Sequence, residues 1–191
     1  MKAIWVVLFV AVLLLLVAVR VYNRLIGVRN QMREGWSGIE VQLKRRHDLV
    51  PALVECVKGY QAHERSLLEA VTRERGEART ACEQGAGEAG RAECVLGRDL
   101  GELVALAEGY PELQADESFR QLMADLVEIE DQIQYARRYY NGSVRDLNNA
   151  AESFPGNLLA GVFGFQKGDF FEVENASQRL SPSLALALKD K

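Results

Sequence analysis

The feature that most constrains this chain is an uninterrupted apolar run near its N-terminus. Residues Ala3–Val19 carry no charge and contain no glycine or proline. These 17 residues are at the short end of a membrane-spanning helix, which needs about 17–25 residues. Lys2 and Arg20 bracket the run, and their long side chains can reach the lipid headgroups. We therefore expect a transmembrane anchor over residues 1–20.

A cleaved signal peptide and a buried core helix are the alternative interpretations of this run. A signal peptide also has a basic start and an apolar middle, but it ends in a cleavage site of the A-x-A type. Residues Val17–Asn23 contain no such site, which favours the anchor. Basic residues are more frequent after the run than before it, with Arg20, Arg24, Arg29 and Arg33 following. By the positive-inside rule, the soluble part is expected in the cytoplasm rather than the periplasm.

Beyond Arg20 the apolar residues follow a helical period. From Val21 to Leu43 they recur in steps of three and four, close to the heptad spacing of a coiled coil. Because proline fits the first turn of a helix, Pro51 predicts a reversal over Arg45–Pro51 and a second helix from about Leu49 to Thr80. The alternative is a single helix that is kinked at Pro51.

Two further helices complete the expected architecture. The glycines of Gly85–Gly90 predict a flexible loop before a third helix over about Ala92–Glu108. Asp116 is expected to cap a fourth helix that ends near Ala151. The predicted fold is all-α, with the N-terminal transmembrane helix continuing into an antiparallel up-down four-helix bundle. The bundle domain is expected over residues 21–172, followed by a mobile C-terminal tail over residues 173–191.

Composition and motifs disfavour several classes of function. The formal net charge of −4 argues against general binding of nucleic acid. Three cysteines without a C-x-x-C pair predict neither a disulfide framework nor a zinc site. His47 and His63 lack the E-x-x-H spacing of a di-metal bundle, and no phosphate loop or G-x-S-x-G motif is present. We expect no catalysis, no metal and no cofactor.

The positions of Cys82 and Cys94, on either side of the glycine loop, leave a disulfide open. The two thiols can pair if the domain is exported and their Cα atoms come within about 7 Å, and they are expected to stay reduced if it is cytoplasmic.

Two polar clusters form the candidate interaction surface. One contains Arg45, Arg46, His47 and Asp48, and the other contains Arg137, Arg138, Tyr140 and Arg145. The structural interpretation is pairing of arginines with carboxylates on helix faces and tyrosine packing in the seam. The functional interpretation is a basic, aromatic-lined groove for a partner or an anionic group.

A phenylalanine-rich stretch, Phe154–Phe171, contains five of the seven phenylalanines. It has too many glycines for a stable helix and is too apolar for a solvated loop. It is expected to cap the end of the bundle, to insert into the membrane interface or to form a partner site. Phe154, Phe163 and Phe165 are the candidate membrane-interface residues.

Several blocks of the chain resemble the LemA family of bacterial membrane proteins. The resemblance is carried by Tyr22–Leu25, Trp36–Pro51, Ala136–Asn141, Val144–Asn148 and Ser153–Ala160. It implies an N-terminal anchor and an antiparallel helical bundle, and it brings no reaction and no catalytic residues. Related proteins take part in magnetosome membrane formation, which implies a role in organising membranes.

We therefore expect a membrane-anchored, non-catalytic scaffold or adaptor that self-associates or binds another membrane protein. The alternative function is a ligand or signal sensor with a pocket between the helices, near Tyr140 and His47. An enzyme with an unrecognised site is the remaining alternative.

Overall fold

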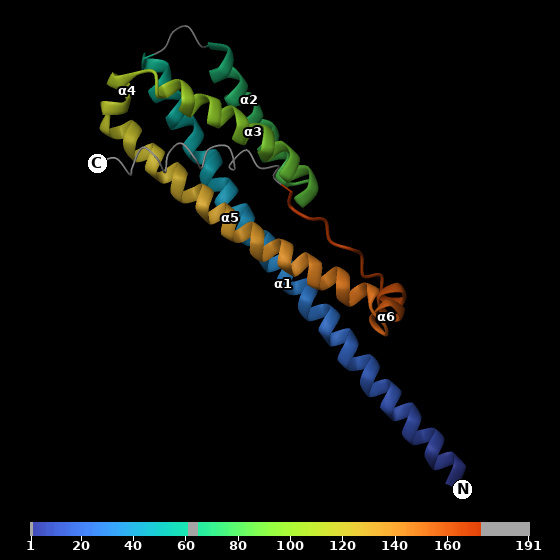
Figure 1. The fold of residues 1–191 in the computed structure, drawn as a ribbon. Coiled ribbons are helices and arrows are strands. Elements are labelled where there is room, and N and C mark those ends of the chain that lie inside the picture. The colour runs from blue at the N-terminus through green and yellow to red at the C-terminus, as the bar shows by residue number, and fades with distance from the viewer. Residues whose placement is uncertain (1, 61–64, 173–191) are drawn as a thin grey trace. The chain divides into compact units, whose positions relative to one another are not determined.

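The computed structural model describes residues 2–60 and 65–172, and within these ranges every regular element is a helix. In chain order the helices are α1 (Lys2–Tyr60), α2 (Arg65–Cys82), α3 (Ala86–Ala107), α4 (Pro111–Ala115), α5 (Glu117–Glu152) and α6 (Gly156–Phe163) (Figure 1). The expected all-α class is therefore confirmed. The predicted tail over residues 173–191 and the side chain of His63 lie outside the described residues.

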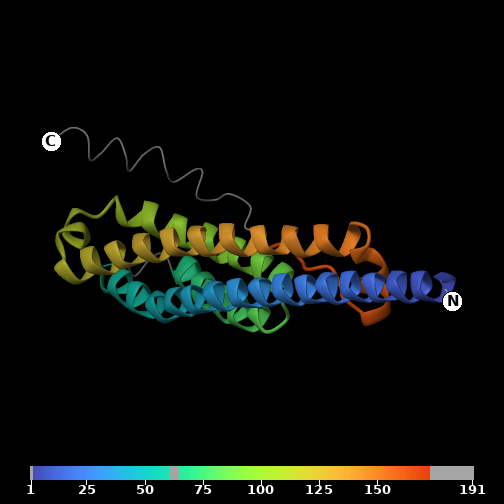
Figure 2. The ribbon, with the colours of Figure 1, turned by 90° about the horizontal axis from the view of Figure 1, so that it is seen from below.

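The chain divides into two compact units, and each contains parts of α1 and α5. Unit 1 comprises Met1–Ser37 and Arg137–Phe170, and unit 2 comprises Gly38–Ala136 and Phe171–Lys191. In unit 2, α2 and α3 lie side by side (Figures 1 and 2). Their buried leucines and valines form one hydrophobic core with the apolar residues of α1, α4 and the first half of α5. Leu53, Val71, Leu96, Leu103 and Leu113 are among its most deeply buried members.

In unit 1, aromatic and glycine contacts join α1 to α5 and α6. Trp36 packs against Tyr140, and Tyr22, nearer the N-terminus, packs against Phe163 of α6. Leu25, Val144 and Leu147 are buried between these contacts. The apolar part of α1 before Arg20 contributes nothing to this core, since its large side chains are exposed.

The expected reversal over Arg45–Pro51 is wrong, because α1 continues through Pro51 to Tyr60. Proline has no N–H, so it leaves the carbonyl of the residue four positions earlier without its helical donor. That carbonyl belongs to His47, and Nε of Arg75 on α2 donates a hydrogen bond to it at 2.5 Å. The guanidinium thus replaces the donor that Pro51 lacks. A local sequence rule is overridden here by a contact from another helix.

This substitution of one donor for another predicts a strong coupling between Arg75 and Pro51. We expect Arg75→Ala to lower the free energy of unfolding of unit 2 by about 1–3 kcal/mol, because a half-buried carbonyl loses its partner. In a Pro51→Ala background the restored N–H reaches the His47 carbonyl, so the same change is expected to cost much less. Hydrogen exchange of α2 peptides in the four proteins of the double-mutant cycle measures the coupling.

Arg79→Ala is the matched control, since Arg79 is an exposed arginine on the same helix. If Arg75→Ala lowered the free energy of unfolding equally with Pro51 and with Pro51→Ala, the Arg75 side chain would not be a substitute for the missing N–H.

The remaining boundaries differ from expectation where glycines were involved. α3 begins at Ala86, so Gly87 and Gly90 lie within a helix and the expected loop is reduced to the turn before it. A Cβ at Gly90 would lie 2.6 Å from the carbonyl oxygen of Glu172, so this glycine permits a close approach of two backbones. The expected capping role of Asp116 is confirmed: its Oδ1 accepts a hydrogen bond from the Phe119 amide at 2.9 Å.

The glycine-rich stretch after α5 also forms a helix, contrary to expectation. α6 covers Gly156–Phe163 and ends at Gly164. Gly164 has φ 67°, the left-handed conformation that glycine adopts without strain at the end of a helix. The Phe165 amide donates to the Ala160 carbonyl at 3.0 Å, which closes the last turn.

Candidate functional site

A buried ionic cluster joins three helices in unit 2. Arg46 and His47 on α1 and Glu93 on α3 are each less than 5% exposed. Nη2 of Arg46 lies 2.8 Å from Oε2 of Glu93, and Nε2 of His47 lies 2.6 Å from Oε1. Nη1 of Arg46 donates to Glu130 on α5 at 2.8 Å. One arginine therefore links a buried carboxylate to a partly exposed one.

The geometry of this cluster suits structural linkage. Nη2 of Arg46 also donates to the backbone carbonyl of Glu93 at 3.0 Å, and its contact with Oε2 is an ion pair without the alignment of a hydrogen bond. The Glu93 carboxylate is thus held by one ion pair and by one hydrogen bond with the His47 ring. Because a buried charge is tolerated only when it is paired, each of these groups depends on the others.

The cluster changes the interpretation of the first predicted surface. Arg46 and His47 are buried and are not surface residues, whereas Arg45 and Asp48 are exposed. The expectation that all four present one surface is therefore wrong for two of them. The reason is helical: positions 46 and 47 continue the buried seam of Ile39, Leu43 and Val50, and residues three or four apart share a face.

Tyr140, in the second predicted cluster, is also buried. Its ring centroid lies 5.6 Å from that of Trp36, and its hydroxyl donates to the Asp169 carbonyl at 2.8 Å. Burial, and secondly the charge of Asp169, raise the pKa of Tyr140 to about 12. A Cβ at Gly35 would lie 3.1 Å from Tyr139 and from the Tyr140 backbone. Tyr140 is a packing residue of unit 1 rather than part of an exposed groove.

The basic residues of this second cluster do reach the surface. Arg138 and Arg145 are exposed and Arg137 is half-buried. Arg138 and Arg145 are seven residues apart on α5 and so share one face. Tyr139, the neighbour of Arg138 in the sequence, is 53% exposed. The exposed part of the predicted surface in unit 1 is therefore a basic-aromatic face, defined by Arg138, Tyr139 and Arg145.

Asn148 holds the segment after α6, a role that the sequence analysis missed. Its side-chain amide donates to the Gly168 carbonyl at 3.1 Å, and its carbonyl oxygen accepts from the Gly168 amide at 2.9 Å. A Cβ at Gly168 would lie 2.6 Å from Sδ of Met32. The paired hydrogen bonds mimic those between strands, so the segment is fixed without belonging to a helix. The only available signal was an asparagine on the inner side of a long helix.

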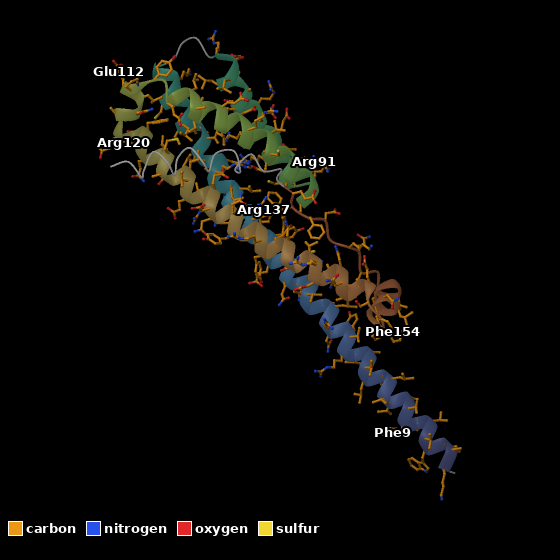
Figure 3. The ribbon with its side chains drawn as sticks, viewed as in Figure 1. Phe9, Arg91, Glu112, Arg120, Arg137 and Phe154 are labelled. Atoms are coloured by element: carbon orange, nitrogen blue, oxygen red, sulfur yellow. The ribbon has the colours of Figure 1, made fainter. Side chains whose placement is uncertain are left out.

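The predicted membrane-interface residues lie in two different environments. Phe165 is half-buried, with the Tyr22 ring 6.0 Å from its own and the Arg29 guanidinium 4.9 Å above it. The ring centroid of Phe163 lies 4.8 Å from that of Tyr22, but Phe163 remains 56% exposed. Phe154 is 81% exposed. Phe154 and Phe9 of α1 both project from the ribbon (Figure 3). Phe154 and Phe163 are therefore exposed enough to contact lipid.

None of Cys56, Cys82 and Cys94 forms a disulfide in the structure. Burial, and then the charges of Glu93 and Glu40, raise the pKa of Cys82 to about 11, with Arg46 opposing them. A thiol with so high a pKa is a weak nucleophile at neutral pH. Among residues 2–60 and 65–172 no group of three or more histidine, cysteine and acidic side chains is arranged to hold a metal ion.

Two open grooves lie in unit 2. One, of about 510 Å³, runs between α2 and α3 and is lined by charged residues such as Arg73, Glu77 and Glu88. The other, of about 830 Å³, lies between α1 and α2 and includes Val54, Lys58 and Leu68. Neither is lined by His47 or Tyr140, the residues near which a sensor pocket was expected. Both side chains are instead engaged in packing and hydrogen bonds.

The described residues contain one helix, α1, that is long and apolar enough to cross a membrane. Its apolar part has no buried residues, with Trp5 and Phe9 each at least 70% exposed. This excludes the alternative of a buried core helix within the chain as described. It also agrees with the expected association with a membrane.

Comparison with known proteins identifies relatives along most of the chain. The sequence profile described as "LemA family" matches residues 35–185. The magnetosome proteins MamQ 1 and MamQ 2 of Paramagnetospirillum magneticum are 28% identical to this chain over 195 residues, covering 90% of this chain and 70% of theirs. Magnetosome protein MamQ of Magnetospirillum gryphiswaldense is 28% identical over 179 residues, covering 81% of this chain and 66% of its own length. The matched residues include the buried cluster and the α5–α6 region, and the chain belongs to the LemA family.

Proposed function

We propose that the protein is a membrane-anchored, non-catalytic scaffold or adaptor of the LemA type. In this proposal the apolar part of α1 crosses the membrane once. The remaining helices form an antiparallel up-down bundle on the cytoplasmic side. The basic-aromatic face of α5 binds a protein partner or a second copy of the chain. The relatives named as magnetosome proteins support a role in organising membranes or membrane-protein assemblies.

The observation that carries this proposal is the continuity of α1. An exposed apolar segment passes without interruption into a helix that is packed in both units. Exposed apolar surface of this extent is not stable in water, so a bilayer is its natural surrounding. A helix that is fixed in a bilayer and then packed by ion pairs and hydrogen bonds holds its exposed side chains in fixed positions. A scaffold requires such a fixed surface for its partners.

Charge identifies the kind of partner that the basic-aromatic face fits. Unit 1 contains nine basic and four acidic residues, a net charge of +5, and unit 2 contains fourteen basic and twenty-three acidic residues, a net charge of −9. An acidic protein surface is complementary to Arg138 and Arg145. Unit 2 of a second copy provides such a surface, so self-association is included in the proposal.

Photo-crosslinking in cells tests this function. We place a photo-reactive phenylalanine analogue at Tyr139 of the full chain and identify the crosslinked proteins by mass spectrometry. The double variant Arg138→Glu/Arg145→Glu is expected to reduce the recovered partner about tenfold or more, because like charges then face each other across the contact. Arg138→Lys/Arg145→Lys is expected to retain most of it, since the positive charge is kept.

The matched control is Arg91→Glu/Arg120→Glu, which makes the same change of charge at two other exposed arginines (Figure 3). Recovery of monomer alone, with no partner and no second copy, would contradict the scaffold function. If the control variant reduced the recovered partner equally, the net charge of the protein, rather than the basic-aromatic face of α5, would govern partner binding.

A further inference from the structure

The outer side of α6 is an exposed apolar surface at a defined place in unit 1. Leu158 is 61% exposed, Val162 77% and Phe163 56%, and Phe154 just before the helix is 81% exposed. The small residues Gly156 and Ala160 are buried and lie on the side of the helix opposite Leu158 and Val162, whereas the Phe163 ring lies nearer their side and packs against Tyr22. The helix therefore rests on unit 1 through small residues and directs Leu158 and Val162 outward. Such a distribution is typical of a helix that lies in a membrane interface.

Contacts within unit 1 place this surface at the end of the apolar run of α1. The Phe163 ring lies 4.8 Å from the ring of Tyr22, and a Cβ at Gly156 would lie 3.9 Å from Cγ1 of Val21. Tyr22 is three residues beyond Val19, the last residue of the apolar run. At a rise of 1.5 Å per residue it is about 5 Å farther along the helix axis. If Ala3–Val19 occupies the hydrocarbon core, Tyr22 and α6 lie at the depth of the headgroups.

The charges of unit 1 favour the same position. Arg20 and Arg24 are exposed on α1 beside the apolar run. Arg29, the next basic residue, lies over the ring of Phe165. Nine basic residues against four acidic ones give unit 1 its net charge of +5. Positive charge next to exposed apolar side chains is the combination that binds an anionic leaflet, since the two contributions add.

We propose that α6 is an interfacial helix that lies on the anionic leaflet beside the anchor, with Phe154, Leu158, Val162 and Phe163 in the lipid. The bilayer is then held at two places, by the spanning part of α1 and by α6. This inference rests on the proposed membrane anchor, and it adds a lipid-binding surface that the anchor alone does not require. It also explains why large apolar side chains remain exposed next to a well-packed core.

The test uses the full chain, reconstituted into vesicles of phosphatidylcholine and phosphatidylglycerol. A diazirine amino acid is placed at Val162, at Leu158 or, as the control, at Val127, an exposed apolar residue of α5. After irradiation, mass spectrometry distinguishes adducts with phospholipid from adducts with protein. We expect about tenfold more phospholipid adduct at positions 162 and 158 than at position 127, because burying several apolar side chains exceeds the free energy that a factor of ten requires.

A charge variant tests the apolar contact directly. With the probe at Leu158, Val162→Asp is expected to remove most of the phospholipid adduct, whereas Val127→Asp is expected to leave it unchanged. Both positions are exposed, so neither aspartate disturbs packing. Vesicles of phosphatidylcholine alone are expected to give less adduct than the anionic mixture.

Crosslinking of position 162 to a second copy, or no adduct at positions 158 and 162, would overturn the proposal. An equal yield in neutral vesicles would overturn the preference for anionic lipid. The scaffold function is tested separately at Tyr139. Partner capture at Tyr139 without lipid adducts at α6 would contradict this inference and leave the scaffold function standing. Lipid adducts at α6 without partner capture at Tyr139 would contradict the scaffold function and leave this inference standing.

Discussion

Replacing Glu93 with alanine is expected to lower the free energy of unfolding of unit 2 by about 3–5 kcal/mol. Glu93 is the buried acidic partner of both Arg46 and His47. Without it, the Arg46 guanidinium remains buried with Glu130 as its one remaining carboxylate partner among the contacts described above, and the His47 ring loses its hydrogen bond with Glu93. Hydrogen exchange of α3 peptides in the full chain, solubilised in detergent, measures this loss.

Three variants separate the lost charge from a general effect of substitution. Glu88→Ala removes an exposed glutamate that pairs with Arg91 on the same helix, and it is expected to cost less than about 1 kcal/mol. Glu93→Gln keeps the size of the side chain, and its loss of unfolding free energy is expected to lie between those of Glu93→Ala and Glu88→Ala. Arg46→Met/Glu93→Leu removes both charges and is expected to recover much of the stability, since neither buried charge is left unpaired. Equal stability of Glu93→Ala and Glu88→Ala would show that the cluster does not link the helices.

Replacing Gly156 with alanine is expected to displace α6 or to destabilise unit 1 by about 1–3 kcal/mol. An added Cβ would lie 2.0 Å from the carbonyl oxygen of Ala150, which belongs to the backbone of α5 and cannot rotate away. Trp36 packs on Tyr140 within the same unit, so its fluorescence reports the unfolding of unit 1 in urea. A Trp5→Phe background leaves Trp36 as the sole tryptophan of the two in the chain.

Gly161→Ala is the control on the same helix. A Cβ there meets nothing within 4 Å, and alanine favours a helix by up to about 1 kcal/mol relative to glycine. We therefore expect this variant to be neutral or slightly stabilised. If Gly156→Ala is no less stable than Gly161→Ala, the close approach of α6 to α5 does not constrain the fold.

Local patterns in the sequence were sufficient to predict the helices whose course does not depend on contacts with distant residues. The steps of three and four from Phe119 to Ala151 correspond to α5, and Asp116 caps it as expected. The charge-free run predicts the one helix among the described residues that is long and apolar enough to cross a membrane. Periodicity and capping act over a few residues, so a single stretch of sequence contains all the information that they need.

The same patterns failed where a distant residue changed the outcome of a local rule. Pro51 would end a helix, but Arg75 supplies the missing donor and α1 continues. Gly90 suggested flexibility, whereas the backbone of Glu172 passes where its side chain would be. Arg46 and His47 were assigned to a surface because their side chains are polar, although their positions fit the buried seam. Glu93, which makes their burial possible, lies more than forty residues away.

By itself, the sequence determined that the chain is helical, that its first part is suited to a membrane, and which face of each long helix is apolar. Only the tertiary structure decided which charged residues are buried, where α1 ends and how the glycine-rich stretch folds into α6. The physical reason is that an apolar seam is recognised from neighbouring residues alone. The burial of a charge, a carbonyl or a glycine depends on a partner that the fold brings from a distant part of the chain.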